Sequence, residues 1–396
     1  MNIKEIFNSI ANSIRSKLGT EDKILPIDYS NEIDKIVVNI IIDKDINEYI
    51  ECICKGLYKY NGSVEGLSIA RYDLAGTSVG DYALFAGGYN NNFDDKFRST
   101  VDSYNSSLVH GIPADLNDGR TQLSVTSIGN YALFGGGSNT EQNILIVDTY
   151  NSSLSKGTAT DLSVARTNIS ATSVGSYAIF AGGFNPNFDN RAVPTVDTYN
   201  SSLTYSTATA LTESKRDSAA TTIGDYALFG GGVNDISTYA TVDTYNSSLT
   251  KGTASDLGIR RQSLAATSVG NYALFGGGVL STNSNNRTYF SNVDSYDSSL
   301  VHNNQKSLSQ ARSGLKSTSV GDYALFAGGL YLVGTKIQYT STVDSYSTTL
   351  VGEINTKLKD TKVNFDTASI GSYALFAGGY SGDYIDNVDV YVSDVV

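Results

Sequence analysis

Residues 82–88 read YALFAGG, and residues 101–104 read VDSY. This pair of segments is written seven times along the 396-residue chain, and successive hydrophobic segments start 46 to 51 residues apart. The hydrophobic segment begins at Tyr82, Tyr131, Tyr177, Tyr226, Tyr272, Tyr323 and Tyr373, and the polar segment begins at Val101, Val147, Val196, Val242, Val293, Val343 and Val388. A period of this length is typical of a repeat architecture, in which each copy forms one structural unit. Features shared by all seven copies are expected to be scaffold, so function is sought where the copies differ.

Each repeat predicts four antiparallel strands. In the third copy we expect a first strand at residues 168–174 and a second at 177–180, joined by a two-residue Gly-Ser turn. The second strand is apolar at nearly every position, as in a strand buried on both faces. Residues 196–199 favour a third strand, and the NSSL that follows predicts a turn into a more polar fourth strand. Seven such units predict an all-β, seven-bladed β-propeller over residues 57–396.

The two ends of the propeller are expected to share one blade. The seventh copy stops just after its third strand, residues 388–392, and lacks a fourth. Residues 62–71, GSVEGLSIAR, align without a gap with residues 157–166, GTATDLSVAR, which lead out of a fourth strand into the next blade. We therefore predict that residues near 57–67 supply the outer strand of blade seven, which leaves fewer unpaired strand edges.

Charge and composition argue against several classes of partner. The chain carries 28 Lys and Arg against 40 Asp and Glu, a formal net charge of −12. A surface this acidic disfavours nucleic acid, which requires clustered Lys and Arg, and anionic membranes. We expect no membrane insertion, because no stretch of 18 consecutive apolar residues occurs, and the N-terminus lacks the apolar run of an ordinary secretory signal.

No cofactor and no metal are expected from the sequence. Cys52 and Cys54 are too close in an extended segment to reach disulfide geometry easily. His110 and His302 follow Leu-Val in equivalent places of two repeats, so we place them in separate outer strands at the rim. The Asp of the VDxY segment recurs in every copy. It is interpreted as a structural acceptor, because a catalytic carboxyl pair needs two different environments.

The repeats resemble those of the kelch family. Arg71, Gly87-Gly88, Val101 and Tyr104 follow the kelch order of an Arg before the first strand, a second strand ending in Gly-Gly and an aromatic residue late in the third. The chain departs from the family in having no Trp; leucines such as Leu108 stand near the place of the usual fourth-strand Trp. The resemblance implies a propeller but no particular activity.

A second resemblance lies in residues 1–56, which we expect to form a small helical region for attachment or oligomerisation. Residues 10–33, IANSIRSKLGTEDKILPIDYSNEI, resemble a segment of tail proteins of phages that infect Gram-positive bacteria. This resemblance implies a component of a virion or of a phage-tail-like bacteriocin that docks to other tail or baseplate proteins, commonly as a homotrimer. The apolar residues that predict one face of an amphipathic helix are Ile3, Phe7, Ile10, Ile14 and Leu18.

The loops between the second and third strands differ most among the copies. Loops on a rigid scaffold commonly carry binding sites, and aromatic rings beside amide and charged groups suit sugars. The alternative is that these rings only pack the loops against one another. The candidate ligand-binding residues are Tyr89, Phe93, Phe97, Arg98, Phe184, Phe188, Arg191, Tyr239, Arg287, Tyr289, Tyr331, Tyr339, Tyr380 and Tyr384.

A second candidate group comprises basic residues that recur just before the first strand. They are Arg71, Arg120, Arg166, Arg216, Arg261 and Arg312, with Lys362 in the seventh copy. Two interpretations are open. The cations form structural pairs with the neighbouring blade, or they ring one mouth of the channel and contact an anionic ligand.

These features together predict a non-catalytic receptor-binding protein, an adhesin, at the tip of a phage or phage-like tail. Its expected ligand is on the bacterial surface, foremost a glycan and otherwise a surface protein, and its expected location is the virion or the phage-tail-like particle. Two alternatives remain open. One is a tail enzyme that degrades glycans, and the other is a purely structural tail or baseplate protein.

Overall fold

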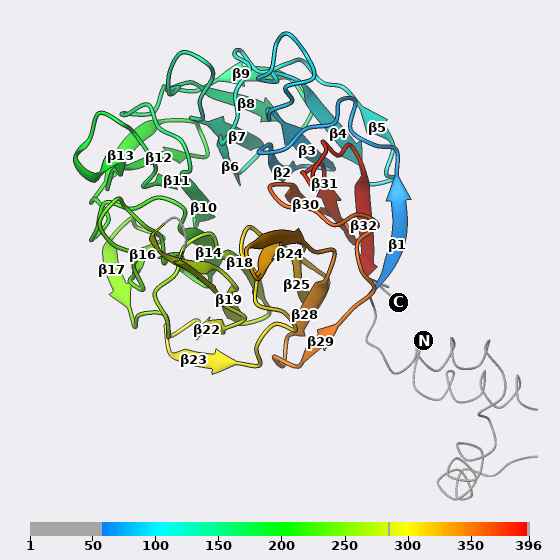
Figure 1. Cartoon of the computed structure of the whole chain (residues 1–396). Coiled ribbons are helices and arrows are strands. Elements are labelled where there is room, and N and C mark those ends of the chain that lie inside the picture. The colour runs from blue at the N-terminus through cyan, green and yellow to red at the C-terminus, as the bar shows by residue number, and fades with distance from the viewer. Residues whose placement is uncertain (1–57, 284–285, 394–396) are drawn as a thin grey trace, which may run out of the picture. The chain divides into compact units, whose positions relative to one another are not determined.

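The computed structural model describes residues 58–283 and 286–393, and within it Lys59–Ser393 form one compact unit. Seven four-stranded antiparallel sheets stand around a central channel (Figure 1), which confirms the predicted all-β, seven-bladed propeller. The predictions for residues 1–56, including the helical region and Cys52 and Cys54, lie outside the described residues. Among the described residues, the one helical element is the short 3-10 turn η1 (Asp189–Arg191), and no helix is long and apolar enough to cross a membrane.

Each blade runs from an inner strand at the channel to an outer strand at the rim. Blades one to three contain β2 (Ala75–Val79), β3 (Tyr82–Ala86), β4 (Val101–Asn105) and β5 (His110–Gly111); β6 (Ser124–Ile128), β7 (Tyr131–Gly135), β8 (Val147–Asn151) and β9 (Lys156–Thr158); β10 (Ser170–Val174), β11 (Tyr177–Ala181), β12 (Val196–Asn200) and β13 (Tyr205–Ala208). Blades four and five contain β14 (Ala219–Ile223), β15 (Tyr226–Gly230), β16 (Val242–Asn246) and β17 (Lys251–Ala254); β18 (Ala265–Val269), β19 (Tyr272–Gly276), β22 (Val293–Asp297) and β23 (His302–Gln305). Blade six contains β24 (Lys316–Val320), β25 (Tyr323–Ala327), β28 (Val343–Ser347) and β29 (Gly352–Ile354).

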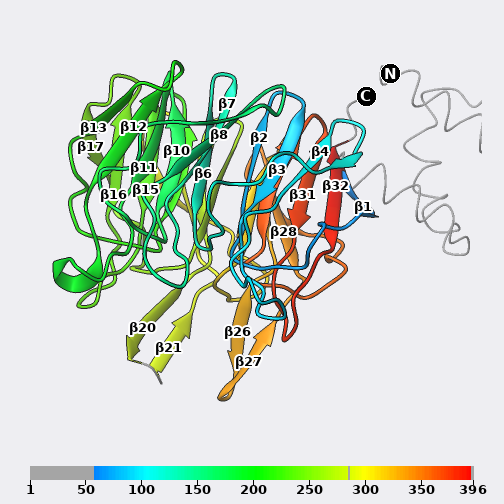
Figure 2. The same cartoon turned by 90° about the horizontal axis from the view of Figure 1, so that it is seen from above.

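Blade seven is assembled from both ends of the propeller. It contains β30 (Asp366–Ile370), β31 (Tyr373–Ala377) and β32 (Val388–Ser393), and its outer strand is β1 (Tyr58–Val64), which pairs with β32. The prediction that residues near 57–67 complete this blade is therefore confirmed. Two extra hairpins, β20 (Val279–Asn283) with β21 (Asn286–Tyr289) and β26 (Leu330–Val333) with β27 (Lys336–Tyr339), extend from one side of the ring (Figure 2).

The hydrophobic second strands build the core because both of their faces are covered. Ala83 and Phe85 of β3 pack with Leu375 of blade seven, whereas Leu84 packs with Phe134 of blade two. All of these side chains have no exposed surface. Complete burial of a Leu or Phe side chain contributes roughly 1.5–3 kcal/mol, which makes the packing between blades the main source of stability.

The VDxY segment fastens each blade to the loop that arrives from the preceding one. In blade one, Asp102 accepts hydrogen bonds from the backbone N–H of Ser68 at 2.8 Å and from Arg71 at 2.6 Å. The Tyr104 hydroxyl donates to the carbonyl of Glu65 at 2.9 Å. The prediction that the repeated Asp is a structural acceptor is confirmed, since every copy has a cation next to it. The seven pairs are Arg71–Asp102, Arg120–Asp148, Arg166–Asp197, Lys215–Asp243, Arg261–Asp294, Arg312–Asp344 and Lys362–Asp389.

The predicted ring of cations at the channel mouth is wrong for Arg71, Arg120, Arg166, Arg261 and Arg312, since these side chains are completely buried. Their partner is also not the neighbouring blade but the third strand of the blade that they precede. In blade four the prediction named Arg216, yet Lys215 occupies the buried place. Burial of a guanidinium group costs much free energy unless the group is paired with a carboxylate. The side chains of these arginines therefore point toward the buried Asp and not toward the channel.

The outer strands supply a further partner to the same Asp. His110 Nε2 lies 2.7 Å from Asp102 Oδ1, and His302 makes the same contact with Asp294. Tyr205 and Tyr60 donate their hydroxyls to Asp197 and Asp389, both at 2.8 Å. The two histidines therefore serve separate blades, as their positions in the repeats indicate.

Candidate functional site

The features that differ among blades gather on one face of the propeller. This face is where the second strands end and the loops to the third strands begin, and both extra hairpins extend from it (Figure 2). Because strands one and two are antiparallel, with Ala75 opposite Ala86, the start of each inner strand reaches the same face. We call it the loop face.

The channel opens on the loop face through a ring of residues with left-handed backbone. Each precedes an inner strand and has φ between 52° and 63°. The ring consists of Asp73, Gln122, Asn168, Asp217, Ser263, Gly314 and Asn364. The backbone N–H of Asp73 donates to the carbonyl of Asn364 at 2.7 Å, and that of Ser263 donates to Asp217 at 2.9 Å. Glycine and short polar residues tolerate this conformation best, which explains most of the residue types in the ring. We call these seven residues the mouth ring.

Two carboxyl groups of the mouth ring are held in an environment that disfavours their charge. Burial raises the pKa of Asp73 to about 7, although Lys316 and Gln122 oppose the shift. Burial also raises the pKa of Asp217, against the influence of Arg216 and of the Asn168 amide, which donates to Asp217 at 2.7 Å. The channel mouth therefore carries less negative charge near neutral pH than its sequence indicates.

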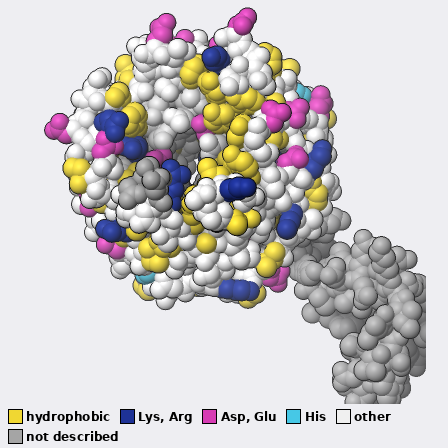
Figure 3. Space-filling view, in the orientation of Figure 1, with side chains coloured by type: hydrophobic (Ala, Val, Ile, Leu, Met, Phe, Trp, Pro, Cys, Tyr) yellow, Lys and Arg dark blue, Asp and Glu magenta, His cyan; other side chains and the backbone are white. Residues whose placement is uncertain are grey.

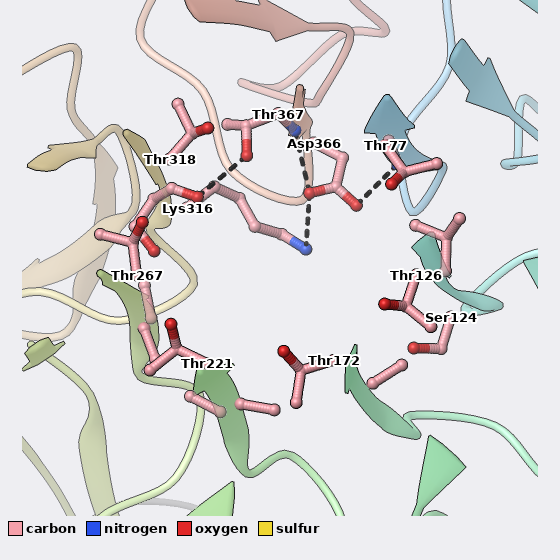
Figure 4. A pocket seen from close by; sticks show the side chains of 18 of the residues that line it. Thr77, Ser124, Thr126, Thr172, Thr221, Thr267, Lys316, Thr318, Asp366 and Thr367 are labelled. Atoms are coloured by element: carbon pink, nitrogen blue, oxygen red, sulfur yellow. Dashed lines mark hydrogen bonds and ion pairs between the residues drawn. The ribbon is translucent and has the colours of Figure 1, made fainter. Parts of the chain in front are cut away.

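Behind the mouth ring the inner strands enclose a channel with a volume of about 650 Å³. Its wall is largely hydroxyl-bearing, because the third residue of the inner strand is Thr in six blades (Figure 4). Those residues are Thr77, Thr126, Thr172, Thr221, Thr267 and Thr318, with Ala368 in blade seven. Leucine and isoleucine side chains, including Leu123 and Ile169, add apolar surface near the mouth ring.

Hydroxyls of the inner strands also join neighbouring blades. Ser127 of blade two donates to the carbonyl of Ser78 in blade one at 2.5 Å, and Thr222 of blade four donates to Ser173 in blade three at 2.6 Å. Each such bond satisfies a carbonyl at the inner edge of a sheet. This role explains the Ser or Thr at the fourth position of four inner strands, namely Ser78, Ser127, Thr222 and Ser369.

One ion pair breaks the sevenfold pattern of the channel wall. Lys316 and Asp366 are the first residues of their inner strands, and Lys316 Nζ lies 3.4 Å from Asp366 Oδ1 (Figure 4). The other oxygen of Asp366 accepts the backbone N–H of Gly76 at 3.0 Å. Among the residues that line the channel, Lys316 is the one basic side chain. The first position of β24 and β30 is a signal visible in the sequence, since the other blades have Ala or Ser there, but neither residue is among the predicted site residues.

Aromatic rings form a cluster beside the mouth ring, over blades six, seven and one. Tyr72 lies at the centre, 5.6 Å from Tyr89, 5.6 Å from Tyr380 and 5.7 Å from Tyr384 between ring centroids. Phe97 extends the cluster from Tyr89, and Tyr339 extends it from Tyr380. Each ring keeps part of its surface exposed. Figure 3 shows hydrophobic side chains gathered along one side of the channel opening. We call these six residues the aromatic cluster; five of them are among the candidates in the variable loops, and Tyr72 is not.

A second group joins the loops of blades three and four. The guanidinium groups of Arg191 and Arg216 lie over the ring of Phe184, at 6.0 and 5.1 Å, and both pair with Asp235. Arg216 thus belongs to the loop face, although not in the position that sequence analysis gave it. Arg191 keeps 57% of its side chain exposed and is the more accessible of the two.

The remaining candidates are dispersed over the loop face. Arg98 lies over the exposed ring of Phe93 at 5.1 Å, and the Tyr239 hydroxyl accepts a hydrogen bond from Asn234. Arg287 and Tyr289 stand on β21, Tyr331 stands on β26, and Phe188 is exposed next to η1. Within the described residues, no group of three or more His, Cys, Asp or Glu side chains is placed to hold a metal ion.

Fold and site together define the class of this protein as a seven-bladed β-propeller with a polar channel and an aromatic loop face. No protein-family model matches the chain, and no curated protein matches it. It is similar to a solved structure titled "Structure of YjhT", with 13% sequence identity and a TM-score of 0.54 over 84% of this chain and 98% of that chain. At this identity the likeness shows the propeller fold alone.

Proposed function

We propose that the protein is a non-catalytic receptor-binding component of a phage or phage-like tail, and that its loop face recognises a glycan on the bacterial surface. The aromatic cluster carries the glycan part of this proposal. The kelch resemblance supports the fold only, and the tail assignment rests on the resemblance of residues 10–33 to phage tail proteins. The N-terminal region would attach to tail or baseplate proteins.

The aromatic cluster has the chemistry of a sugar platform. Tyr72 and Tyr384 lie nearly parallel, with 14° between their ring planes, and the ring of Tyr380 lies at 60° and 70° to them. Tyrosine offers an apolar face to the C–H groups of a sugar ring and a hydroxyl to its polar rim. Burial raises the pKa of Tyr72 to about 12, so its hydroxyl stays protonated and able to donate. A platform of several rings suits an extended polysaccharide better than a small compact ligand.

The binding experiment compares the full chain with variants of the cluster on Gram-positive cells and purified wall polysaccharides. Tyr89→Ala and Tyr384→Ala are expected to reduce binding at least tenfold. The control is Tyr177→Ala, because Tyr177 begins a second strand at the opposite end of its blade. The proposal of glycan recognition fails if no cell or polysaccharide is bound, or if the control weakens binding as much as the cluster variants do.

The tail assignment and the trimer need separate measurements. Antibodies raised against the propeller should label one end of tail-like particles from the source strain in electron micrographs. Light scattering should give three times the 42.2 kDa mass of the chain. Three copies would strengthen attachment to a repeating glycan by avidity, even where each site binds weakly. Absence of labelling would remove the tail assignment while leaving glycan binding intact.

One observation favours the alternative that the protein cleaves glycans. A carboxyl group whose pKa is about 7, such as that of Asp73, has the property of a general acid at neutral pH. The test is release of reducing ends from the bound polysaccharide by the full chain and by Asp73→Asn. Release that disappears in the variant, whose binding is unchanged, would replace the adhesin by an enzyme.

A further inference from the structure

We propose that the central channel binds one uncharged sugar unit, held by Lys316, Asp366 and the free threonine hydroxyls of the wall. The inference deepens the proposed function, on which it rests: the aromatic cluster holds the outer part of a glycan, and the channel receives its terminal unit. Within the propeller, the channel then decides which sugar is accepted.

The strongest argument is that the channel wall departs from its own repeat at two adjacent places. Five blades begin the inner strand with a small residue, namely Ala75, Ser124, Ser170, Ala219 and Ala265. Blades six and seven have Lys316 and Asp366 instead. Five blades form the same strand without a charge, so the fold itself does not require one here. The one Lys of the channel lining, paired with an Asp on the adjacent inner strand, indicates a ligand.

Lys316 and Asp366 both retain hydrogen-bonding capacity toward the channel. Lys316 is 39% exposed, and its ammonium group has three N–H donors, whereas its ion pair with Asp366 at 3.4 Å engages at most one of them. Asp366 is 17% exposed and accepts from the backbone N–H groups of Gly76 and Thr367. Four acceptor positions on a carboxylate leave room for a further donor.

Three threonines supply an independent observation. Thr126, Thr221 and Thr267 are exposed by only 7, 7 and 8%, and their side chains point into the channel (Figure 4). None of their hydroxyls has a hydrogen-bond partner among the described residues, whereas Thr77, Thr172 and Thr318 bond to a neighbouring blade. The buried polar atoms that have no partner among the described residues do not include these three hydroxyls, so the hydroxyls are open to the channel and available to a ligand there.

An uncharged sugar fits this set of groups better than a charged one. Neighbouring hydroxyls of a sugar can donate to Asp366 and accept from Lys316 at once, so both charges remain balanced. The apolar wall around Leu123 and Ile169 suits the C–H face of the ring. A carboxylate on the sugar would meet Asp366 and Asp217, and an ammonium group would meet Lys316. The volume of about 650 Å³ lies within the range of small-molecule sites.

The test measures monosaccharide binding to the full chain by calorimetry and by ligand-observed NMR. The neutral probes are glucose, galactose, mannose, rhamnose and N-acetylglucosamine, and the charged probes are glucuronic acid and glucosamine. We expect at least one neutral sugar to bind with a millimolar or lower Kd. Lys316→Ala, Asp366→Ser and Thr221→Val should each weaken it tenfold or more. The first two variants introduce residues that other blades carry at the same place, so the fold should persist.

The matched control is Lys357→Ala, which removes one exposed Lys outside the channel and should leave binding unchanged. Tyr384→Ala should lose polysaccharide binding yet keep monosaccharide binding. The inference is overturned if no neutral monosaccharide binds, if a charged sugar binds more tightly, or if Lys316→Ala binds as the wild type does. Polysaccharide binding without monosaccharide binding would overturn this inference alone, and the reverse result would overturn the adhesin proposal alone.

Discussion

The guanidinium group of Arg71 lies 2.6 Å from the carboxylate of Asp102, and neither side chain has any exposed surface. The same guanidinium donates to the carbonyl of Phe85 at 3.1 Å, so one cation connects the incoming loop with the second and third strands of blade one. Blades four and seven use Lys215 and Lys362 for this purpose. The pair is therefore a joint of the fold and not a binding site.

Removing one partner of this pair should destabilise the protein strongly. Arg71→Met leaves Asp102 buried without its cation, and loss of one partner of a buried pair typically costs about 3–5 kcal/mol. Arg71→Lys should cost clearly less, because two blades already have Lys in this place. Urea unfolding followed by tyrosine fluorescence measures both. Equal stability of Arg71→Met and the wild type would contradict this role.

The mouth ring should make stability depend on pH. The pKa of Asp73 is about 7 in the folded protein, against about 3.9 in an unfolded chain, so the folded state binds the proton more tightly. Stability is then lost as the pH rises from about 4 to about 7. Asp73→Asn should remove this loss and gain roughly 4 kcal/mol at pH 8, since each unit of raised pKa corresponds to about 1.4 kcal/mol, with little change at pH 4. Asn already occupies the ring at Asn168 and Asn364, so the left-handed backbone is tolerated.

Urea unfolding at pH 4, 6 and 8 checks this dependence. The control is Asp81→Asn, since Asp81 is exposed in a hairpin turn at the other end of blade one. A gain at pH 8 that is the same for both variants would show a general effect of net charge, and the assignment to Asp73 would fail.

The architecture could be predicted from the sequence because every blade repeats the same local rules. Seven hydrophobic strands, seven Gly-containing turns and the missing fourth strand gave the blade number and the closure by β1. The structural role of Arg71 and its equivalents was harder to predict. An Arg before a strand has the same sequence pattern whether its side chain faces the channel or a buried Asp. Only the packing of the blade decides between the two.

The loop face could be predicted only in part. The variable loops contain five members of the aromatic cluster, which could therefore be predicted. Tyr72 lies just before an inner strand, in a segment that recurs in the other repeats and was interpreted as scaffold. Lys316 and Asp366 were visible as departures from Ala or Ser, yet their meeting at 3.4 Å depends on how adjacent blades face each other. Contacts between blades are long-range in sequence, and no local pattern encodes them.

Loss of Tyr60 should weaken closure of the ring, whereas loss of the equivalent tyrosine in blade three, Tyr205, should leave its blade in place. Tyr60 donates to Asp389 and lies 5.4 Å from the Tyr391 ring; Tyr205 donates to Asp197 and lies 5.6 Å from the Tyr199 ring. Both Tyr60→Ala and Tyr205→Ala lose the same local contacts. Only the first also weakens the strand that joins the two ends of the propeller. We expect faster limited proteolysis within residues 58–64 for Tyr60→Ala, and an intact chain for Tyr205→Ala. Equal cleavage rates in the two variants would show that the outer strand of blade seven is held no more weakly than that of blade three.

The glycines that end the second strands should be required for close approach and not only for their backbone conformation. Gly88 has φ of +108°, and a Cβ there would lie 2.9 Å from the carbonyl oxygen of Tyr72. Gly382 has φ of +106°, but a Cβ there would meet nothing within 4 Å. Gly382→Ala should therefore cost about 1–2 kcal/mol, the strain of a left-handed alanine alone. Gly88→Ala adds a backbone clash beside the Arg71–Asp102 pair, so its loss of unfolding free energy should exceed that of Gly382→Ala by at least about 1 kcal/mol. Urea unfolding of both variants decides the matter, and equal losses would mean that the backbone conformation alone selects glycine at Gly88.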